Sequence, residues 1–208
     1  MTVPDETERV RRLYDDAASK YDRLVGFAEK VLFGDGRRWV CAQAQGDVLE
    51  IAVGTGRNFP FYPADARLVA IDVSPGMLDV ARARAQELGR EVDVHLGDAQ
   101  ALDFPDARFD TVVSTLALCT IPDERAAVAE AKRVLRPGGR FLLLEHVRSP
   151  RLPVRAVQRL LEPLFVRLQA DHLLREPLKV IEAEGFVVER LERSKWGLVE
   201  RLAVRKPT

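Results

Sequence analysis

The spacing of hydrophobic and polar residues along the chain changes near residue 47. Before that point, residues 5–33 carry apolar side chains at helical spacing, among them Tyr14, Tyr21 and Val25. After it, short apolar runs bounded by glycine, proline or acidic residues alternate with segments of helical periodicity. The first pattern predicts an N-terminal helical region. The second is typical of βαβ units and favours a parallel sheet.

Five apolar runs predict the parallel strands of this sheet. In chain order they are DVLEIAV, RLVAIDV, VDVHLGD, FDTVVSTLALCTI and RFLLLEHV. Between them, SPGMLDVARARAQELG is expected to form a helix with Ser74 as its N-cap, and DERAAVAEAKRVLRPGG a helix stopped by Pro-Gly-Gly. After a helical stretch from about 150 to 184, FVVERLERSK and LVERLAVRKP predict two strands that pair antiparallel at the sheet edge.

These elements predict an α/β fold in one domain, residues 1–208. It is a doubly wound, Rossmann-like sheet of seven strands, mostly parallel with an antiparallel edge pair, and it carries additional N-terminal helices. The length suits a single domain with a sizeable core. In such sheets ligands bind beside the carboxyl ends of the strands, so we expect the functional residues there.

The composition disfavours several classes of protein. Lysine plus arginine and aspartate plus glutamate number 32 each, so net charge gives no support for a nucleic-acid partner. Cys41 and Cys119 lie in apolar surroundings, which predicts a reduced, cytoplasmic protein without disulfides. The N-terminus has no apolar core typical of a signal peptide, and no run of about 18 apolar residues predicts a membrane span.

The stretch VLEIAVGTGRNF contains a glycine turn directly after the first strand. A dinucleotide-binding turn would require a glycine at position 59, which is Phe59. A P-loop would require lysine and then serine or threonine after Gly56, where Arg57 stands. The turn therefore does not fit a phosphate group, and taken alone it could be an ordinary strand-to-helix connection.

Three acids accompany this turn. Glu50 lies inside the first strand, whereas Asp72 lies near the end of the second strand and Asp98 at the end of the third, at the same expected edge. A carboxylate at the position of Asp72 can accept hydrogen bonds from a ribose diol. Without a phosphate-binding lysine, this arrangement suits a nucleoside that carries a positive charge, such as a sulfonium with an amino-acid tail.

Several segments together resemble the class I S-adenosylmethionine-dependent methyltransferases, in the group that includes the ubiquinone/menaquinone-biosynthesis methyltransferases. The segments are VLEIAVGTGRN, LVAIDVSPGMLDVARARA, GDAQALDFPDARFDTVVSTLALCTIPD and EAKRVLRPGGRFLLLEHV. YDDAASKYDRL, from residue 14, is similar to the lid helix of the family. The family motif E-x-G-x-G-x-G has Ala52 in place of its first glycine here, a residue small enough to keep the turn tight.

The resemblance implies how the chain is divided. Residues 1–40 would form a helical lid and residues 41–148 the cofactor-binding core. Residues 149–185 would form helices that cover the substrate, and residues 186–208 the terminal strand pair. The cofactor would be S-adenosyl-L-methionine, with S-adenosyl-L-homocysteine as the product.

The resemblance also implies a set of cofactor-binding residues around the strand ends and the lid. They are Tyr21, Glu50, Ala52, Gly54, Gly56, Asn58, Asp72, Ser74, Met77, Asp98, Ala99 and Leu116. Asp72 would hold the ribose hydroxyls, Asp98 the adenine amino group, and Leu116 would lie beside the transferable methyl. For Tyr21, Met77 and Leu116, ordinary packing is the alternative interpretation.

The catalytic candidates lie at the end of the fifth strand and in a later segment. His146 ends that strand, and Asp171 and His172 lie in the segment expected to cover the substrate. Methyl transfer depends mainly on positioning, and a general base is needed only where the acceptor carries a proton to be removed. No metal site is predicted from the sequence.

Residues 148–168 combine arginines with leucines, and two interpretations of this segment stay open. It can be an amphipathic cover helix with a solvated basic face, or a surface that contacts an anionic membrane peripherally. A longer run, TLALCTI…VLRPGGRFLLLEHV…LEPLF…RE…W, is also similar to the methyltransferase-like proteins that act as alkyl thiol S-methyltransferases, and bacterial phospholipid N-methyltransferases have comparable cores. We therefore expect a small apolar or lipid-like acceptor, either a thiol, an amine or a quinol-type ring, with phosphatidylethanolamine as the alternative.

Two rival classes of function are less favoured. The fourth strand lacks the Asn/Asp-Pro-Pro-Tyr/Phe sequence that would hold a nucleic-acid base amine, and no basic domain is attached. A protein methyltransferase stays a weaker alternative. A cofactor-binding protein without catalysis would be expected to lose Asp72 or the glycine turn, and both are present.

Overall fold

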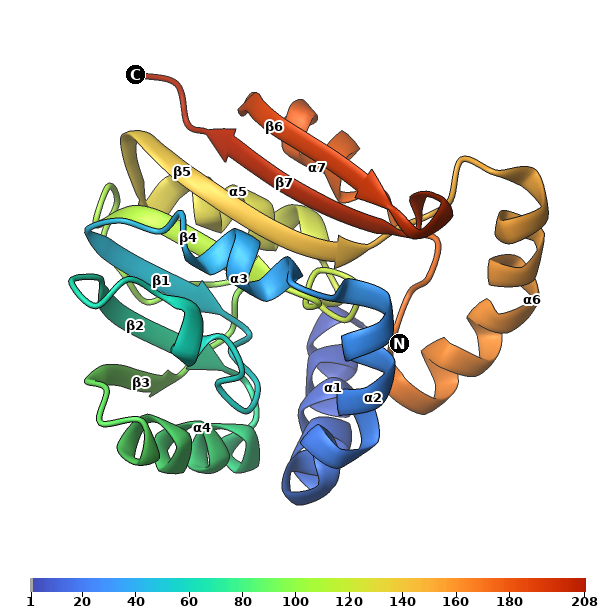
Figure 1. Ribbon diagram of the computed structural model, residues 1–208, viewed down its shortest axis with the longest axis horizontal. Coiled ribbons are helices and arrows are strands. Elements are labelled where there is room, and N and C mark those ends of the chain that lie inside the picture. The colour runs from blue at the N-terminus through green and yellow to red at the C-terminus, as the bar shows by residue number, and fades with distance from the viewer. Residues whose placement is uncertain (1) are drawn as a thin grey trace.

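The sheet of the computed structural model confirms the predicted fold class (Figure 1). The structure describes residues 2–208, apart from the side chain of Pro4. Seven strands run in the order β3-β2-β1-β4-β5-β7-β6. Their bounds are β1 Asp47–Ile51, β2 Arg67–Asp72, β3 Val92–Leu96, β4 Phe109–Thr115, β5 Leu135–His146, β6 Val187–Ser194 and β7 Val199–Arg205. The first five strands are parallel, and β7 pairs antiparallel with both β5 and β6.

Helices cover both faces of the sheet, and further helices lie beside the carboxyl ends of the parallel strands. Their bounds are α1 Val3–Ala17, α2 Tyr21–Phe33, α3 Gly36–Cys41, α4 Pro75–Glu87, α5 Glu124–Val134, α6 Leu152–Gln169 and α7 Pro177–Ala183. One buried apolar cluster joins α3 and α4 to one face, and a second joins α5 and α7 to the other. Figure 1 shows α1, α2 and α6 outside these layers, beside the carboxyl ends of the parallel strands.

The N-terminus of α4 follows the sequence prediction. Ser74 has extended backbone angles, and its hydroxyl accepts a hydrogen bond of 3.1 Å from the Met77 amide, as an N-cap does. Pro75 occupies the first turn, where its missing N–H costs no hydrogen bond. This cap fixes where the helix starts, directly after the end of β2.

One predicted boundary was wrong. The helix after β4 ends at Val134, and Leu135 already pairs with Phe109, so the Pro-Gly-Gly sequence lies inside β5 at a shift in register. The helical stretch predicted from about 150 to 184 contains two helices, α6 and α7. Ala170 adopts a left-handed conformation, with φ of 54°, which ends α6 before an irregular connection to α7.

The fourth strand is shorter than its apolar run. It ends at Thr115, and Leu116 turns the chain with a left-handed φ of 55°. Leu116 therefore lies beyond the strand and not near its middle, although its amide still donates to the Leu144 carbonyl at 2.8 Å. The apolar residues that follow, including Cys119, form a buried turn that an apolar pattern does not distinguish from a strand.

One carboxyl group lies inside the sheet. Glu50 of β1 is only 2% exposed, and its two oxygens accept hydrogen bonds of 2.8 Å from the Asn58 amide group and the Tyr62 hydroxyl. Burial raises the pKa of Glu50 to about 7, although these donors and the nearby charge of Arg37 favour the ionised form. Its ionisation near neutral pH therefore costs folding free energy.

This cost gives a stability prediction for Glu50→Gln. The ordinary pKa is 4.5, so between that value and about 7 the folded state binds the proton more strongly than the unfolded state, and stability falls as pH rises. Glutamine does not ionise. The unfolding free energy of the native protein minus that of the variant should therefore fall by about 2 kcal/mol from pH 5.5 to pH 8. Urea unfolding at the two pH values measures this difference, and a pH-independent difference would contradict the assignment.

Candidate functional site

A cavity lies at the carboxyl ends of β1, β2 and β4, and its empty space of about 800 Å³ includes the part that is open to solvent. Its wall on the sheet side comes from the strand ends, and its roof from α1 and α2. The lining includes Thr7, Val10, Tyr14, Tyr21, Arg37, Ala52, Gly54, Thr55, Asp72, Met77, Asp98, Ala99 and Leu116.

The turn after β1 brings the backbone to this cavity. Ala52, Gly54 and Gly56 all have positive φ values, of 50°, 55° and 74°. A Cβ on Gly54 would meet no atom within 4 Å, so this residue faces open space. A Cβ on Gly56 would lie 2.5 Å from the ring of Phe59, so Gly56 is needed for packing and does not line the cavity.

Asp72 connects two of the strand ends. One carboxylate oxygen accepts a 2.8 Å hydrogen bond from the Gly54 amide and the other a 2.9 Å bond from the Ser74 amide. The side chain is 7% exposed and lines the cavity. Burial raises the pKa of Asp72 above its ordinary value, while the backbone donors oppose this shift. Each oxygen retains a lone pair that can accept a further hydrogen bond.

Glu50 and Asn58 lie behind the cavity wall and do not line it. The Asn58 amide group donates to Glu50, and its carbonyl oxygen accepts a 2.8 Å bond from Arg37. The same guanidinium nitrogen donates to Thr115 at the end of β4, and Arg37 also pairs with Glu29 of α2. This buried chain of polar contacts ties the turn after β1 to both β4 and the covering helix.

Further contacts hold α1 and α2 over the cavity. Asp22 of α2 accepts a 2.7 Å bond from the Thr55 hydroxyl and pairs with Arg84 of α4. Asp15 of α1 accepts a 2.8 Å bond from the Ser74 hydroxyl. Ser74 therefore caps α4 and anchors α1, and it is not part of the cavity wall.

Two tyrosines form part of the roof. Tyr21 begins α2, and its ring centroid lies 6.0 Å from that of Tyr14 on α1. Burial raises the pKa of Tyr21 to about 12, so its phenol stays neutral at physiological pH. Both rings line the cavity, including Tyr14, whose position in the site the sequence did not indicate.

The remaining predicted cofactor contacts also line the cavity. Asp98 accepts a 2.9 Å hydrogen bond from the backbone amide of Gln100 and a second one from the side-chain amide of Gln100. Met77, Ala99 and Leu116 contribute apolar surface to the wall. Of the predicted set, Glu50, Gly56, Asn58 and Ser74 support the wall from behind, and the others face the cavity.

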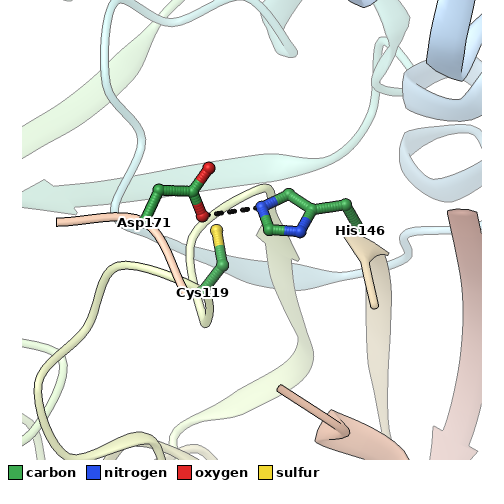
Figure 2. A group of neighbouring side chains, drawn as sticks. All are labelled: Cys119, His146 and Asp171. Atoms are coloured by element: carbon green, nitrogen blue, oxygen red, sulfur yellow. Dashed lines mark hydrogen bonds and ion pairs between the residues drawn. The ribbon is translucent and has the colours of Figure 1, made fainter. Parts of the chain in front are cut away.

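A second group of side chains lies behind the turn that follows β4 (Figure 2). His146 at the end of β5 and Asp171 after α6 share a hydrogen bond of 2.8 Å between Nε2 and Oδ1. The thiol of Cys119 lies beside this pair. His172 does not join them, because its Nδ1 lies 3.5 Å from a carboxylate oxygen of Glu162.

The charges in this group influence each other. Burial alone lowers the pKa of His146, but the hydrogen bond and charge of Asp171 outweigh it, so this pKa lies above its ordinary value. Burial raises the pKa of the Cys119 thiol well above its ordinary range. The structure therefore brings together two of the three predicted catalytic residues and adds Cys119, which was not among the predicted site residues.

Sequence reasoning missed Arg37, Thr7 and Val10 at the cavity. Val10 belongs to the apolar side of α1, so helical spacing could have indicated it. No local sequence pattern indicates Arg37, because its role depends on partners in α2, β4 and the turn after β1. No helix within residues 2–208 is both long enough and apolar enough to cross a bilayer.

The chain is similar in sequence to several known methyltransferases. A family model described as a methyltransferase domain matches residues 49–143. The chain is 38% identical to the phosphatidylethanolamine N-methyltransferase of Cereibacter sphaeroides over 56% of this chain and 58% of that protein. It is 36% identical to the demethylmenaquinone methyltransferase of Renibacterium salmoninarum, over 74% and 64% of the two chains. With the human thiol S-methyltransferase TMT1A it is 30% identical over 86% and 77%.

The alignments span about three fifths of the two bacterial relatives, 58% and 64% of their lengths. Among solved structures, an S-adenosylmethionine-dependent methyltransferase from Thermotoga maritima has a TM-score of 0.72 at 19% identity, covering 95% of this chain and 99% of that one. This similarity shows a shared fold. The human relative is matched over most of its length, and the family model covers the strands that build the cavity. The chain belongs to the class I S-adenosylmethionine-dependent methyltransferases, in the group that contains the menaquinone, thiol and phosphatidylethanolamine methyltransferases.

Proposed function

We propose that this methyltransferase acts on a small apolar or lipid-like acceptor, either a thiol, an amine or a quinol-type ring. The observation that carries the proposal is the exposure of large apolar side chains on α2 and α6, the helices beside the cofactor cavity. Phe27 of α2 is 81% exposed and Leu160 of α6 is 80% exposed. Exposed apolar patches of this kind commonly mark sites that contact lipid, ligand or another apolar surface.

The apolar surface on α6 extends along the helix. Its exposed large side chains are Leu152, Val157, Leu160, Leu161, Leu164 and Leu168. Only Gln158 of this helix is buried, so the apolar residues of α6 are not used to build the core. This favours the second interpretation of residues 148–168, in which the segment does more than cover the site.

Positive charge accompanies the apolar residues. Arg151, Arg159 and Arg167 are exposed on α6 or at its start, and Lys20 and Arg23 are exposed at the start of α2. Basic residues beside exposed leucines are typical of helices that lie in the interface of an anionic membrane. We therefore propose peripheral contact with such a surface. The similarity to a phosphatidylethanolamine N-methyltransferase supports phosphatidylethanolamine as the alternative acceptor.

In the proposed reaction, residues 41–148 bind the cofactor, residues 1–40 cover it and residues 149–185 border the acceptor. S-adenosylmethionine supplies a methyl group activated by a cationic sulfur. Asp72 would accept hydrogen bonds from the ribose hydroxyls, and the open side of Gly54 would let the backbone approach the cofactor. Positioning and exclusion of water by α1 and α2 are the main contributions expected of the protein, worth about 7–11 kcal/mol in favourable cases.

The ribose contact predicts the effect of Asp72→Asn. An amide has one acceptor oxygen, so it cannot keep both backbone hydrogen bonds and also hold a ribose hydroxyl. The Kd for S-adenosylhomocysteine, measured by calorimetry, should rise at least tenfold, which corresponds to about 1.4 kcal/mol. Asp93→Asn, at an exposed position on β3, is the matched control and should leave the Kd unchanged. Equal affinity in the Asp72 variant would show that the ribose lies elsewhere.

The membrane contact predicts the effect of Leu160→Glu combined with Leu164→Glu. These residues lie one helical turn apart, so the two acids place negative charge on the proposed membrane face. Binding to vesicles of phosphatidylethanolamine and phosphatidylglycerol, measured by sedimentation, should weaken at least tenfold. Leu191→Glu on β6, also exposed, is the control that should still bind. Failure of the native protein to bind these vesicles at low salt would contradict the proposal.

A further inference from the structure

We propose that Cys119, His146 and Asp171 form a binding site for a zinc-type divalent ion. Each residue offers one ligand atom, and the three atoms all lie within 4.8 Å of one another. Figure 2 shows the thiol, the imidazole and the carboxylate converging on one point. No other group of this kind occurs within residues 2–208.

The three ligands come from separate parts of the chain. Cys119 lies in the turn after β4, His146 ends β5, and Asp171 follows the left-handed residue that ends α6. The strand fixes His146, whereas the other two residues lie on irregular backbone. A second contact joins these two segments, because the amide of His172 donates to the Cys119 carbonyl at 3.0 Å. The fold itself therefore holds the ligands together.

The spacing is close to that of a tetrahedral site. Zinc binds thiolate sulfur at about 2.3 Å and imidazole nitrogen or carboxylate oxygen at about 2.0–2.2 Å, which places neighbouring ligand atoms roughly 3.3–3.7 Å apart. Nε2 of His146 and Oδ1 of Asp171 are now 2.8 Å apart, and the other separations are at most 4.8 Å. Changes of about 1 Å at the two loop residues are enough to reach this geometry.

The ligand chemistry also suits such an ion. A thiolate and a carboxylate together neutralise a dication, which matters because Cys119 is only 3% exposed and a buried net charge is costly. The combination of sulfur, nitrogen and oxygen ligands favours zinc over magnesium or calcium, which prefer oxygen alone. Three protein ligands leave a fourth position open, as in catalytic zinc sites.

The location gives this open position a role that rests on the proposed function. Thr120 and Ile121, which follow Cys119, line the cofactor cavity, so the ion would lie next to its wall. A thiol acceptor bound there would release its proton to solvent. The thiolate sulfur would form the new bond to the methyl carbon, and the electrons of the broken C–S bond would stay on the cofactor sulfur, which leaves neutral S-adenosylhomocysteine. The site therefore points to a thiol as the acceptor.

Cobalt titration of the metal-free full-length chain tests the ion site. We expect one equivalent of Co²⁺ to produce a thiolate-to-cobalt absorption band, and Zn²⁺ to displace it. Cys119→Ser should abolish the band, and His146→Gln should weaken Co²⁺ binding at least tenfold. Cys41→Ser removes the other buried cysteine and should keep the full band. Unchanged binding of S-adenosylhomocysteine by the Cys119 variant would show that it is folded.

Each outcome bears on a defined claim. A native protein without the band, or a Cys119 variant that retains it, would overturn the ion site and leave a hydrogen-bonded group of three side chains. The readout needs no acceptor, so it does not depend on the proposed function. If the ion binds and thiols are not methylated in a screen with labelled cofactor, the site stands and the thiol assignment falls.

Discussion

The cofactor cavity depends most on the hydrogen bonds of the buried Asp72 carboxylate. Its two oxygens hold the amides of Gly54 and Ser74, so one side chain at the end of β2 fixes both the turn after β1 and the start of α4. A buried carboxylate is tolerated only when it is hydrogen-bonded, and these amides provide that compensation. A Cβ on Gly54 would meet no atom within 4 Å, so a ligand can approach the backbone of this turn.

A second set of buried polar contacts connects this turn to its cover. The chain from Glu50 through Asn58 and Arg37 reaches Glu29 of α2, so the sheet and the covering helix share one hydrogen-bonded network. The charged side of α2 is used for closing the cavity, which leaves Phe27 on the opposite side exposed. The same helix therefore closes the cavity on one side and carries part of the exposed apolar surface on the other.

Much of this arrangement could be predicted from sequence because it follows from local patterns. The apolar runs predicted where the strands lie along the chain and that most of them are parallel, and Ser74 marked the start of α4. Predictions failed where the chain turns without a glycine, as at Leu116, because an apolar pattern contains no information on a left-handed φ. The group of Cys119 with His146 could not be predicted either, because its members meet only through the sheet and the end of α6.

The central claim is that the strand ends and the two N-terminal helices form the binding site for S-adenosylmethionine. A crystal structure with bound S-adenosylhomocysteine tests this claim most directly. The account predicts the ribose hydroxyls on Asp72, the adenine between Met77 and Asp98, and the sulfur near Leu116 under Tyr21. A ligand bound elsewhere, or this cavity occupied only by solvent at saturating ligand, would contradict it.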